Sequence, residues 1–230
     1  MRSLANTEVD IWLVNQAISP EQANGFLKQL SPDEQIRVHS FYFDKDKRQY
    51  IASRYALRQI LSLYLPVQAR ELHFTYSKFE KPTLPDADVQ FNVSHSYGKA
   101  IVAIAKKPIG IDIEWSLREV ELDELAKRFF SKKEATEFLK LEEREKQRYF
   151  FYIWTKKEAV IKAIGEGLSY PLDQFHVAIH PEKKEIYFDD PEMEKVPWTV
   201  KALIVPHHEF VAAMAVMGEV NRVTMKEFLF

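Results

Sequence analysis

The most constraining feature of this sequence is a succession of segments that occurs twice, at a spacing of about 100 residues. A helical segment near 46–65, the segment Leu72-His-Phe74 and the apolar strand Ala100–Ala105 recur as a helix over 148–165, Phe175-His-Val177 and Phe210–Ala215. We therefore expect an α+β protein of two pseudo-equivalent α/β lobes related by duplication. The expected division is 1–112 and 113–230, with the linker near 113–118. Because ligand sites favour the interface between lobes, we expect the active site in the cleft there.

Apolar alternation and turn residues divide the chain into further expected elements. Expected strands are Val9–Val14, Leu72–Tyr76, Ala100–Ala105, Ile111–Trp115, Gln174–Ile179, Glu185–Phe188, Trp198–Val205 and Phe210–Met217. Helices are expected after Ser19-Pro20, near 46–65 and over Leu122–Phe130. Ser31-Pro-Asp-Glu34 and Ser131-Lys-Lys-Glu134 have the capping-box spacing that begins a helix.

The charge balance and the lack of cysteine exclude several classes of protein. Of the 230 residues, 46% are hydrophobic and 29% are charged, and the formal net charge is −2. This charge argues against a general affinity for nucleic acid or an anionic membrane, and no stretch reaches the length of a membrane span. Without cysteine there is no disulfide framework, thiolate zinc site or thiol nucleophile. We expect a cytoplasmic protein.

Two carboxylates lie on one face of the expected strand Ile111–Trp115. Alternation puts Asp112 and Glu114 on one side and Ile111 and Ile113 on the other. Side chains two residues apart on a strand are separated by about 7 Å, so these carboxylates repel each other inside a cleft unless a cation joins them. A metal ion is the natural partner.

The segment Trp154–Leu168 predicts a helix that carries a third carboxylate. Glu158 and Lys162 are four residues apart and share a face with Trp154. A solvated Glu–Lys pair is the simplest interpretation of that spacing alone. Together with Asp112 and Glu114, however, Glu158 completes an oxygen-rich set that favours Mg²⁺ or Mn²⁺ over zinc.

A magnesium site of this kind indicates a phosphorylated substrate. Magnesium commonly completes its coordination shell with phosphate oxygens, so nearby basic residues are candidates for binding the rest of the phosphate. These candidates are Lys81, His95, Lys157 and Lys162.

Four motifs resemble those of the Sfp-type 4′-phosphopantetheinyl transferases, in the family's order and spacing. They are Phe91-Asn-Val-Ser-His-Ser96, Gly110-Ile-Asp-Ile-Glu114, Phe129-Phe-Ser-Lys-Lys-Glu134, and Trp154-Thr-Lys-Lys-Glu-Ala159 with Lys162 and Gly165-Glu-Gly-Leu168. The match spans most of residues 30–175. The resemblance implies a monomer of two lobes with coenzyme A and Mg²⁺ in the cleft. It also implies transfer of the phosphopantetheine arm to a serine hydroxyl of an apo acyl or peptidyl carrier protein, with release of 3′,5′-ADP.

The resemblance also implies roles for single residues. Asp112, Glu114 and Glu158 resemble the metal ligands, Glu134 the base that takes the serine proton, and Lys162 a catalytic partner of the pyrophosphate. The implied contacts to coenzyme A are Arg48, Lys81, Pro82, Ser94, His95, Lys157 and Lys162, of which Lys81 and His95 resemble contacts to the 3′-phosphate and adenosine end.

Two positions depart from the family's pattern. Glu80 stands where many relatives have glycine before Lys81-Pro82. Glu34 stands where a relative places a lysine toward the 3′-phosphate, so that Arg37 would have to supply this charge.

Three alternatives stay open on the sequence alone. A metal-dependent phosphodiesterase or nuclease would use the same carboxylates to activate water. A non-catalytic module would bind carrier proteins without turnover. The capping box alone also explains Glu134, with no part in catalysis.

Overall fold

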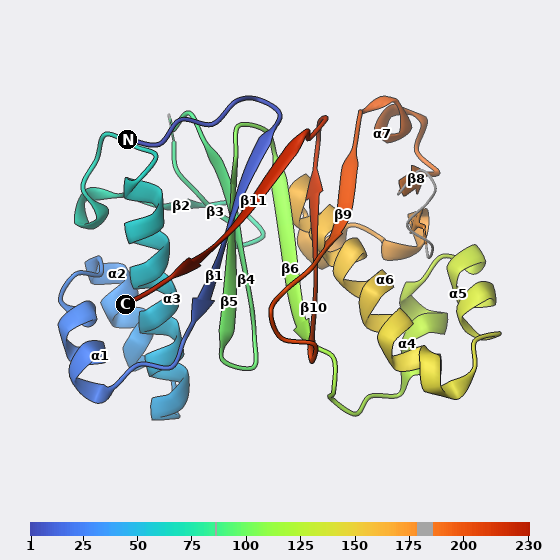
Figure 1. The fold of residues 1–230 in the computed structure, drawn as a ribbon, viewed down its shortest axis with the longest axis horizontal. Helices are drawn as coiled ribbons and strands as arrows, with labels where there is room; N and C mark the ends of the chain where they lie inside the picture. Colours follow the sequence, from blue (N-terminus) through green and yellow to red (C-terminus); the bar gives the residue numbers. More distant parts are fainter. Residues whose placement is uncertain (86, 179–185) are drawn as a thin grey trace.

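The structure is a computed structural model that describes residues 1–85, 87–178 and 186–230, and it has helices on both sides of a pair of central sheets (Figure 1). The helices are α1 (Pro20–Leu27), α2 (Pro32–His39), α3 (Asp44–Ser62), α4 (Leu122–Phe129), α5 (Lys132–Phe138), α6 (Glu143–Ile164) and α7 (Pro191–Lys195). Short 3-10 turns are η1 (Ala69–Glu71), η2 (Gly167–Ser169) and η3 (Leu172–Gln174). The strands are β1 (Glu8–Asn15), β2 (Thr75–Tyr76), β3 (Pro82–Thr83), β4 (Gln90–Ser96), β5 (Lys99–Ala105), β6 (Ile109–Trp115), β7 (Phe175–Val177), β8 (Ile186–Phe188), β9 (Thr199–Leu203), β10 (Phe210–Val216) and β11 (Arg222–Phe228).

Each lobe contributes one of the central sheets. The first sheet has the order β11-β1-β5-β4 and the second has the order β6-β10-β9. Only β11 runs parallel to its neighbour among these described pairs; the others are antiparallel. β11 comes from the end of the sequence and joins the N-terminal lobe, while β6 belongs to the C-terminal sheet. The division expected after residue 112 therefore falls inside β6.

The two sheets pack face to face between the helices, which gives the layer order helix, sheet, sheet, helix. Alternate residues of β5 demonstrate this arrangement: Val102 and Ile104 pack in one core with Leu57 and Leu61 of α3. Ile101 instead packs in a second core formed by both sheets. Because β5 is buried on both faces, its sequence is continuously apolar rather than alternating. α6 covers the outer face of the second sheet.

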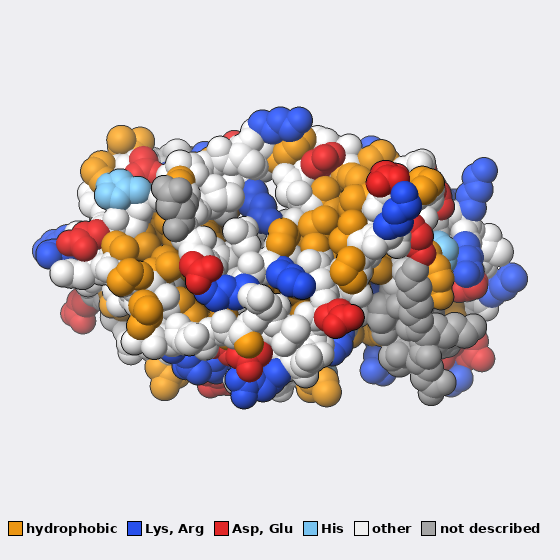
Figure 2. Space-filling view, turned by 90° about the horizontal axis from the view of Figure 1, so that it is seen from above, with side chains coloured by type: hydrophobic (Ala, Val, Ile, Leu, Met, Phe, Trp, Pro, Cys, Tyr) orange, Lys and Arg blue, Asp and Glu red, His pale blue; other side chains and the backbone are white. Residues whose placement is uncertain are grey.

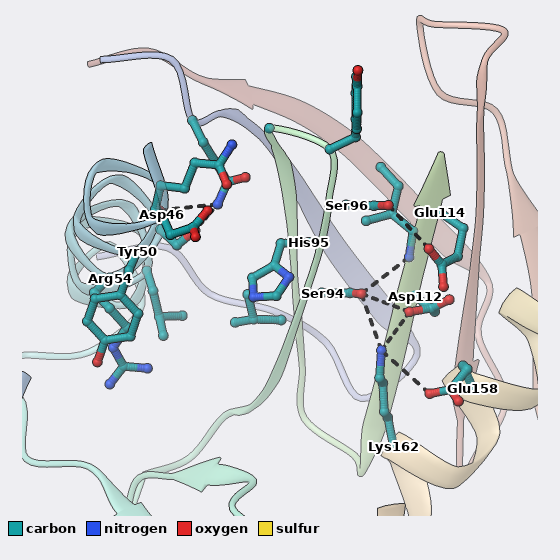
Figure 3. Close-up of a pocket in the computed structure, with 18 of the residues that line it drawn as sticks. Asp46, Tyr50, Arg54, Ser94, His95, Ser96, Asp112, Glu114, Glu158 and Lys162 are labelled. Carbon is teal, nitrogen blue, oxygen red and sulfur yellow. Dashed lines mark hydrogen bonds and ion pairs between the residues drawn. The ribbon is translucent and has the colours of Figure 1, made fainter. Parts of the chain in front are cut away.

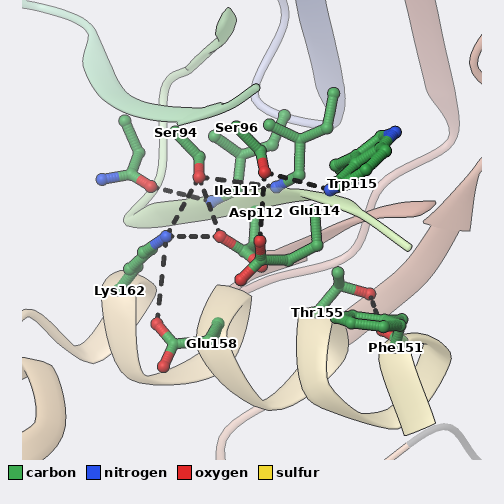
Figure 4. Close-up of polar contacts among 12 residues, drawn as sticks. Ser94, Ser96, Ile111, Asp112, Glu114, Trp115, Phe151, Thr155, Glu158 and Lys162 are labelled. Carbon is green, nitrogen blue, oxygen red and sulfur yellow. Dashed lines mark hydrogen bonds and ion pairs between the residues drawn. The ribbon is translucent and has the colours of Figure 1, made fainter. Parts of the chain in front are cut away.

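Side chains of β4 join the two sheets where β4 lies beside β6 (Figure 4). The backbone N–H groups of Ile111, Ile113 and Trp115 donate hydrogen bonds to the side-chain oxygens of Asn92 (2.9 Å), Ser94 (3.4 Å) and Ser96 (3.0 Å), respectively. Short polar side chains at every second position thus replace the backbone ladder of an ordinary sheet. The motif at 91–96 therefore fixes the position of β6 relative to the N-terminal lobe.

Most expected elements are confirmed with shifted ends, and several differ. β3 and α7 lie in segments, 78–88 and 189–194, that the sequence predicts as loops. The expected strand Leu72–Tyr76 is reduced to β2, because Leu72 directly follows η1 and its carbonyl oxygen accepts a hydrogen bond from Arg58 Nη1. β4 and β11 were not expected: the polar residues at alternate positions of β4 conceal its pattern, and β11 is a half-exposed edge strand. The expected strands Gln174–Ile179 and Glu185–Phe188 extend into residues outside the described part of the chain, and their described parts form β7 and β8.

The surface carries no large field of one sign on the face drawn in Figure 2, where acidic and basic side chains of the described residues are interspersed. This distribution agrees with the small net charge of the chain. Among the described helices, none has both the length and the apolar character that crossing a membrane requires.

Candidate active site

A cleft of about 700 Å³ lies between α3 of the N-terminal lobe and α6 of the C-terminal lobe (Figure 3). Both central sheets contribute to its floor, through β4 and β6. Its described lining includes Asp46, Gln49, Tyr50, Ser53 and Arg54 of α3, Pro82 of β3, Ser94 and His95 of β4, Tyr97 and Gly98 of the turn after β4, Asp112 and Glu114 of β6, and Trp154, Glu158 and Lys162 of α6.

The C-terminal wall of the cleft gathers three carboxylates around one ammonium group. Lys162 Nζ lies 2.6 Å from Asp112 Oδ1 and 3.9 Å from Glu158 Oε2 (Figure 4). It also donates to Ser94 Oγ at 3.2 Å, and the Ser94 hydroxyl in turn donates to Asp112 Oδ1 at 2.8 Å. Glu114 completes the set and accepts a hydrogen bond from Ser96 Oγ at 3.2 Å.

A glycine brings α6 close enough to β6 for this contact. A Cβ atom added to Gly110 would lie 1.9 Å from the carbonyl oxygen of Ala159 and 2.4 Å from the backbone nitrogen of Ala163. Only glycine permits such an approach of strand and helix backbones. The glycine of the Gly110–Glu114 motif therefore sets the distance between the helix that carries Glu158 and the strand that carries Asp112.

The C-terminal wall, which we call the acidic wall, has more negative charge than its own cations neutralise. Burial raises the pKa of Glu158 to about 7. Burial, followed by repulsion from Asp112, raises the pKa of Glu114. Besides Lys162, Arg118 Nη2 lies 3.2 Å from Glu114 Oε1. Asp112 Oδ2 is buried without a hydrogen-bond partner.

These observations fit a divalent cation at the acidic wall, because an unpartnered buried carboxylate oxygen is a strong acceptor for a hard cation. In the described part of the chain, no three histidine, aspartate or glutamate side chains are already gathered at metal-holding distances. Lys162 lies among the carboxylates instead, so binding a cation requires Lys162 to move away from Asp112.

Seven of the expected site residues line the cleft together. They are Pro82, Ser94, His95, Asp112, Glu114, Glu158 and Lys162. Four other expected residues, Arg48, Lys81, Glu134 and Lys157, are not among the residues that line it.

Glu134 and Lys157 lie inside the C-terminal lobe rather than in the cleft. Glu134 is 1% exposed and Lys157 is 0% exposed. Lys157 Nζ lies 2.8 Å from Glu134 Oε2 and donates to the carbonyl oxygens of Leu172 and Phe175, both at 2.7 Å. The expected contact of Lys157 with coenzyme A is thus corrected: on α6, Lys157 points away from the face that carries Glu158. Glu134 likewise does not reach the cleft as expected of a base.

Lys81 and Arg48 lie outside the described lining of the cleft, and their expected contacts with coenzyme A stay predictions. Lys81 Nζ donates to the carbonyl oxygens of Lys162, at 2.5 Å, and of Ile109, at 3.3 Å. The last carbonyls of a helix lack intrahelical partners and attract a cation, which explains why Lys81 binds the end of α6. Burial lowers its pKa to about 8. Arg48 lies half-buried on α3, outside the cleft lining.

Most of the N-terminal wall and the turn after β4 were not predicted from the sequence. Tyr50 and Arg54 face the cleft from α3 across from His95 (Figure 3). Tyr97 stacks on Trp115 with ring centroids 4.0 Å apart. Gly98, just before the apolar segment Ala100–Ala105, is a turn residue that could have located Tyr97 in a hairpin turn at the rim.

Comparisons with known proteins agree with this architecture. A family profile described as "4′-phosphopantetheinyl transferase, N-terminal" matches residues 17–108, and one described as "4′-phosphopantetheinyl transferase superfamily" matches residues 108–215. The chain is 35% identical over 222 residues to the 4′-phosphopantetheinyl transferase HetI of Nostoc sp., which covers 94% of this chain and 90% of that protein. This chain belongs to the 4′-phosphopantetheinyl transferase family.

Two further similarities were found for this phosphopantetheinyl transferase. The chain is 35% identical over 170 residues to the 4′-phosphopantetheinyl transferase Sfp of Bacillus subtilis, covering 74% of this chain and 75% of that protein. A crystal structure of the holo-acyl-carrier-protein synthase of Thermotoga maritima aligns with a TM-score of 0.38 and 20% identity, covering 49% of this chain and 63% of that one. The two family profiles of the transferase meet at residue 108, immediately before β6.

Proposed function

We propose that this transferase moves the 4′-phosphopantetheine arm of coenzyme A to a serine hydroxyl of an apo acyl or peptidyl carrier protein, in a Mg²⁺-dependent reaction that releases 3′,5′-ADP. The serine oxygen bonds to the phosphorus that bears the pantetheine arm while that phosphorus loses its bond to the bridging pyrophosphate oxygen. The serine proton passes to a base. We further propose that the enzyme acts as a cytoplasmic monomer.

The convergence of Asp112, Glu158 and Lys162 at one wall of the inter-lobe cleft is the observation that carries this proposal. Asp112, Glu114 and Glu158 would hold Mg²⁺ or Mn²⁺, and the buried Asp112 Oδ2 without a partner supports that role. A bound divalent cation would supply positive charge to the pyrophosphate oxygens as the leaving group departs.

The chain's own side chains supply the remaining charge and the orientation. Lys162 can turn its ammonium group from Asp112 toward an incoming pyrophosphate, which makes it the catalytic cation of the proposal. Ser94 holds the carboxylate of Asp112 through its hydroxyl. His95 and Pro82 line the cleft toward the N-terminal lobe, where we propose that the 3′-phosphate and the adenosine end bind.

Arg54 is a further cation, on the N-terminal wall of the cleft. Because Arg54 lies across the cleft from the acidic wall, we propose that the two walls bind opposite ends of coenzyme A. Arg54 Nε lies 2.6 Å from Glu34 Oε1, and Arg54 also lines the cleft. The cleft thus has an acidic wall suited to a metal ion and a second wall that carries an arginine. This division supports a substrate with phosphates at two places, as coenzyme A has.

The test is incubation of the purified protein with coenzyme A, Mg²⁺ and an apo carrier protein, followed by mass spectrometry of the carrier. We expect the mass of one phosphopantetheine group to be added, and excess EDTA to stop the reaction. Glu158→Gln should lower the rate by ~10²-fold or more, because a metal ligand supplies several kcal/mol of transition-state stabilisation. Glu137→Gln, an exposed position on α5, is the matched control and should retain full activity.

Two outcomes would contradict the proposal. Hydrolysis of coenzyme A without any gain of mass on the carrier would indicate a metal-dependent phosphodiesterase. Binding of the carrier protein without turnover would indicate a non-catalytic module.

A further inference from the structure

A buried glutamate in the N-terminal lobe joins two arginines of α3 to the start of α2. Glu34 Oε2 accepts hydrogen bonds from the backbone N–H of Ser31 (3.0 Å) and from Arg58 Nε (2.7 Å), while Oε1 accepts from Arg54 Nε. Arg58 Nη1 donates onward to the carbonyl oxygens of Ala69 (2.9 Å) and Leu72 (3.0 Å), at η1. Glu34 and Arg58 are each 1% exposed. We call this pair the N-terminal ion pair.

The C-terminal lobe contains the same arrangement. Glu134 Oε2 accepts from the backbone N–H of Ser131 (2.7 Å) and lies 2.8 Å from Lys157 Nζ, while Oε1 accepts from the backbone N–H of Val177 (2.7 Å). Lys157 Nζ donates onward to the carbonyl oxygens of Leu172 and Phe175, at the two ends of η3. We call Glu134 and Lys157 the C-terminal ion pair.

The two ion pairs occupy equivalent positions of the internal repeat. Ser131, Glu134 and Leu172 stand 100 positions after Ser31, Glu34 and Leu72 (131 − 31, 134 − 34 and 172 − 72). Arg58 is the fifteenth residue of α3 counted from Asp44, and Lys157 is the fifteenth residue of α6 counted from Glu143. In each lobe a capping-box glutamate, a cation on the long helix and the carbonyls of the following 3-10 turn form one buried group.

The carboxylates of the acidic wall lie on β6 and α6, and among the described residues Glu34 does not line the cleft. What both lobes share is therefore structural. Each ion pair ties three segments together: a short capped helix, the long helix and the turn that follows the long helix. The same arrangement occurs in the N-terminal lobe, away from the carboxylates of the acidic wall. The ion pair of the C-terminal lobe therefore needs no catalytic explanation.

We propose that Glu134 and Lys157 are a positioning pair that fixes the orientation of α6, and that Glu134 does not take the proton of the carrier serine. This proposal rests on the proposed function for the identity of the reaction. Successive residues of a helix point about 100° apart, so holding Lys157 toward the lobe interior directs Glu158 toward the cleft, and Lys162 with it one turn later.

The contacts that both oxygens of the Glu134 carboxylate already make support the same assignment. One oxygen is held by Val177 N–H, and the other by Ser131 N–H and Lys157 Nζ. A base must come within hydrogen-bond reach of the proton that it abstracts. Glu134 would have to leave two backbone hydrogen bonds and its ion pair with a buried lysine to do so.

A double-mutant cycle separates a positioning pair from a base. The variants are Glu134→Gln, Lys157→Met and the double variant, measured for urea midpoint and for turnover at saturating coenzyme A and Mg²⁺. Lys157→Met alone leaves a buried glutamate without its cation, so it should cause the largest loss of stability and turnover. Adding Glu134→Gln should recover part of the lost stability and bring turnover to within about tenfold of the unmodified enzyme.

A catalytic base predicts a different pattern. Losing a general base typically costs ~10² to 10⁴ in rate, so both variants that contain Glu134→Gln would stay at that floor whatever residue stands at 157. A normal urea midpoint for Glu134→Gln, with at least a ~10²-fold loss of turnover that Lys157→Met does not relieve, would overturn the proposal.

The pH–rate profile of Glu134→Gln alone provides a second measurement, should the double variant not fold. If another group is the base, the acid limb of the profile keeps its midpoint in this variant, although the rate is lower. Disappearance of the acid limb would make Glu134 the titrating base and would contradict the positioning role.

Metal binding provides a readout that loss of stability alone would not change. By calorimetric titration with Mn²⁺, Glu134→Gln/Lys157→Met should bind about tenfold more weakly, because groups that orient a metal ligand typically contribute that much. The matched control is Glu34→Gln/Arg58→Met, in which Gln59 rather than a metal ligand follows the altered cation, and its Mn²⁺ affinity should be unchanged. Equal weakening in both double variants would refute a local positioning effect. If the unmodified protein neither binds Mn²⁺ nor modifies a carrier, the proposed function fails, while the urea midpoints still test the ion pair.

Discussion

The helices α3 and α6 occupy matching places in the two lobes but carry different residues beside their shared ion pair. The residue that follows the ion-pair cation is Gln59 in α3 and Glu158 in α6. Four residues further on, the chain has Leu63 at the end of α3 and Lys162 in the last turn of α6. The two lobes have a buried glutamate and a buried cation at equivalent positions, whereas the residues directed at the cleft differ.

The two helices also differ in how closely they approach their sheets. α6 approaches β6 so closely that Gly110 has no room for a Cβ atom. α3 is held instead by large side chains such as Leu57 and Leu61, which pack on Trp12 and Val102 of the first sheet. A helix separated from its sheet by leucine side chains cannot bring its own polar groups to a strand. The difference explains why the carboxylate cluster formed only in the C-terminal wall of the described cleft.

The largest effect in this comparison is expected from the substitution Gly110→Ala. The new methyl group would collide with the backbone of α6, which cannot move aside cheaply, so we expect a loss of about 3 kcal/mol in the free energy of unfolding. A small displacement of α6 from Asp112 should also lower turnover by about a hundredfold. Urea titration and carrier modification measure the two effects.

Gly25→Ala is the matched control in the N-terminal lobe. Nothing lies within 4 Å of a Cβ atom at Gly25, in α1. Alanine there should increase the free energy of unfolding by roughly 0.5–1 kcal/mol and leave turnover unchanged. Similar losses in both variants would mean that α6 does not depend on close backbone contact.

A medium effect is expected from Lys81, the N-terminal residue that binds the end of α6. Burial lowers its pKa from 10.5 to about 8 in the folded protein. Between these two values the unfolded chain holds a proton that the folded chain has released, so stability rises as pH increases from about 8 to 10.5. Lys81→Met should lack this rise, which urea midpoints across the pH range would reveal.

Lys78→Met serves as the control for that pH series, because Lys78 is exposed in the same loop. It should follow the unmodified protein at every pH. Identical pH dependence in the unmodified protein and in Lys81→Met would mean that Lys81 keeps its proton, and that its hydrogen bonds to the α6 carbonyls outweigh its burial.

The smallest effect is expected at Glu80, in the turn that precedes Lys81. Its φ of 62° lies in the left-handed region that glycine adopts freely. Glu80→Gly should therefore raise the free energy of unfolding by about 0.5–1 kcal/mol, with unchanged turnover. Glu80→Ala is the control, because it removes the same charge but keeps the Cβ atom. If its melting curve matches that of Glu80→Gly, the gain in stability comes from the lost charge and not from the backbone conformation.

The sequence predicted the acidic wall well because its signals are local. Alternation along a strand put Asp112 and Glu114 on one face, and helical spacing put Glu158 and Lys162 together. The internal repeat likewise predicted two lobes with a cleft between them. Each of these inferences needs only the period of a single element, or the comparison of one half with the other.

The parts that the sequence analysis missed depend on contacts between distant segments. Lys157 and Glu158 are neighbours in the sequence, and only the packing of α6 determines which of them faces the cleft. Ser94 of β4 suggested a contact with coenzyme A, whereas its hydroxyl, like that of Ser96, also replaces a sheet ladder to β6. The capping-box spacing of Glu134 was visible, but its buried lysine partner was not.

The position of β11 has a consequence for how the chain is made. Arg222 to Phe228 pair with Glu8 to Val14, so the first sheet takes one edge from the latest part of the described sequence. On the ribosome, β1 would emerge more than two hundred residues before its parallel neighbour (222 − 8 for the first pair). Until then its outer edge offers unpaired backbone groups to any other strand. We expect nascent chains stalled before residue 222 to require chaperone protection in proportion to the time that this edge stays open.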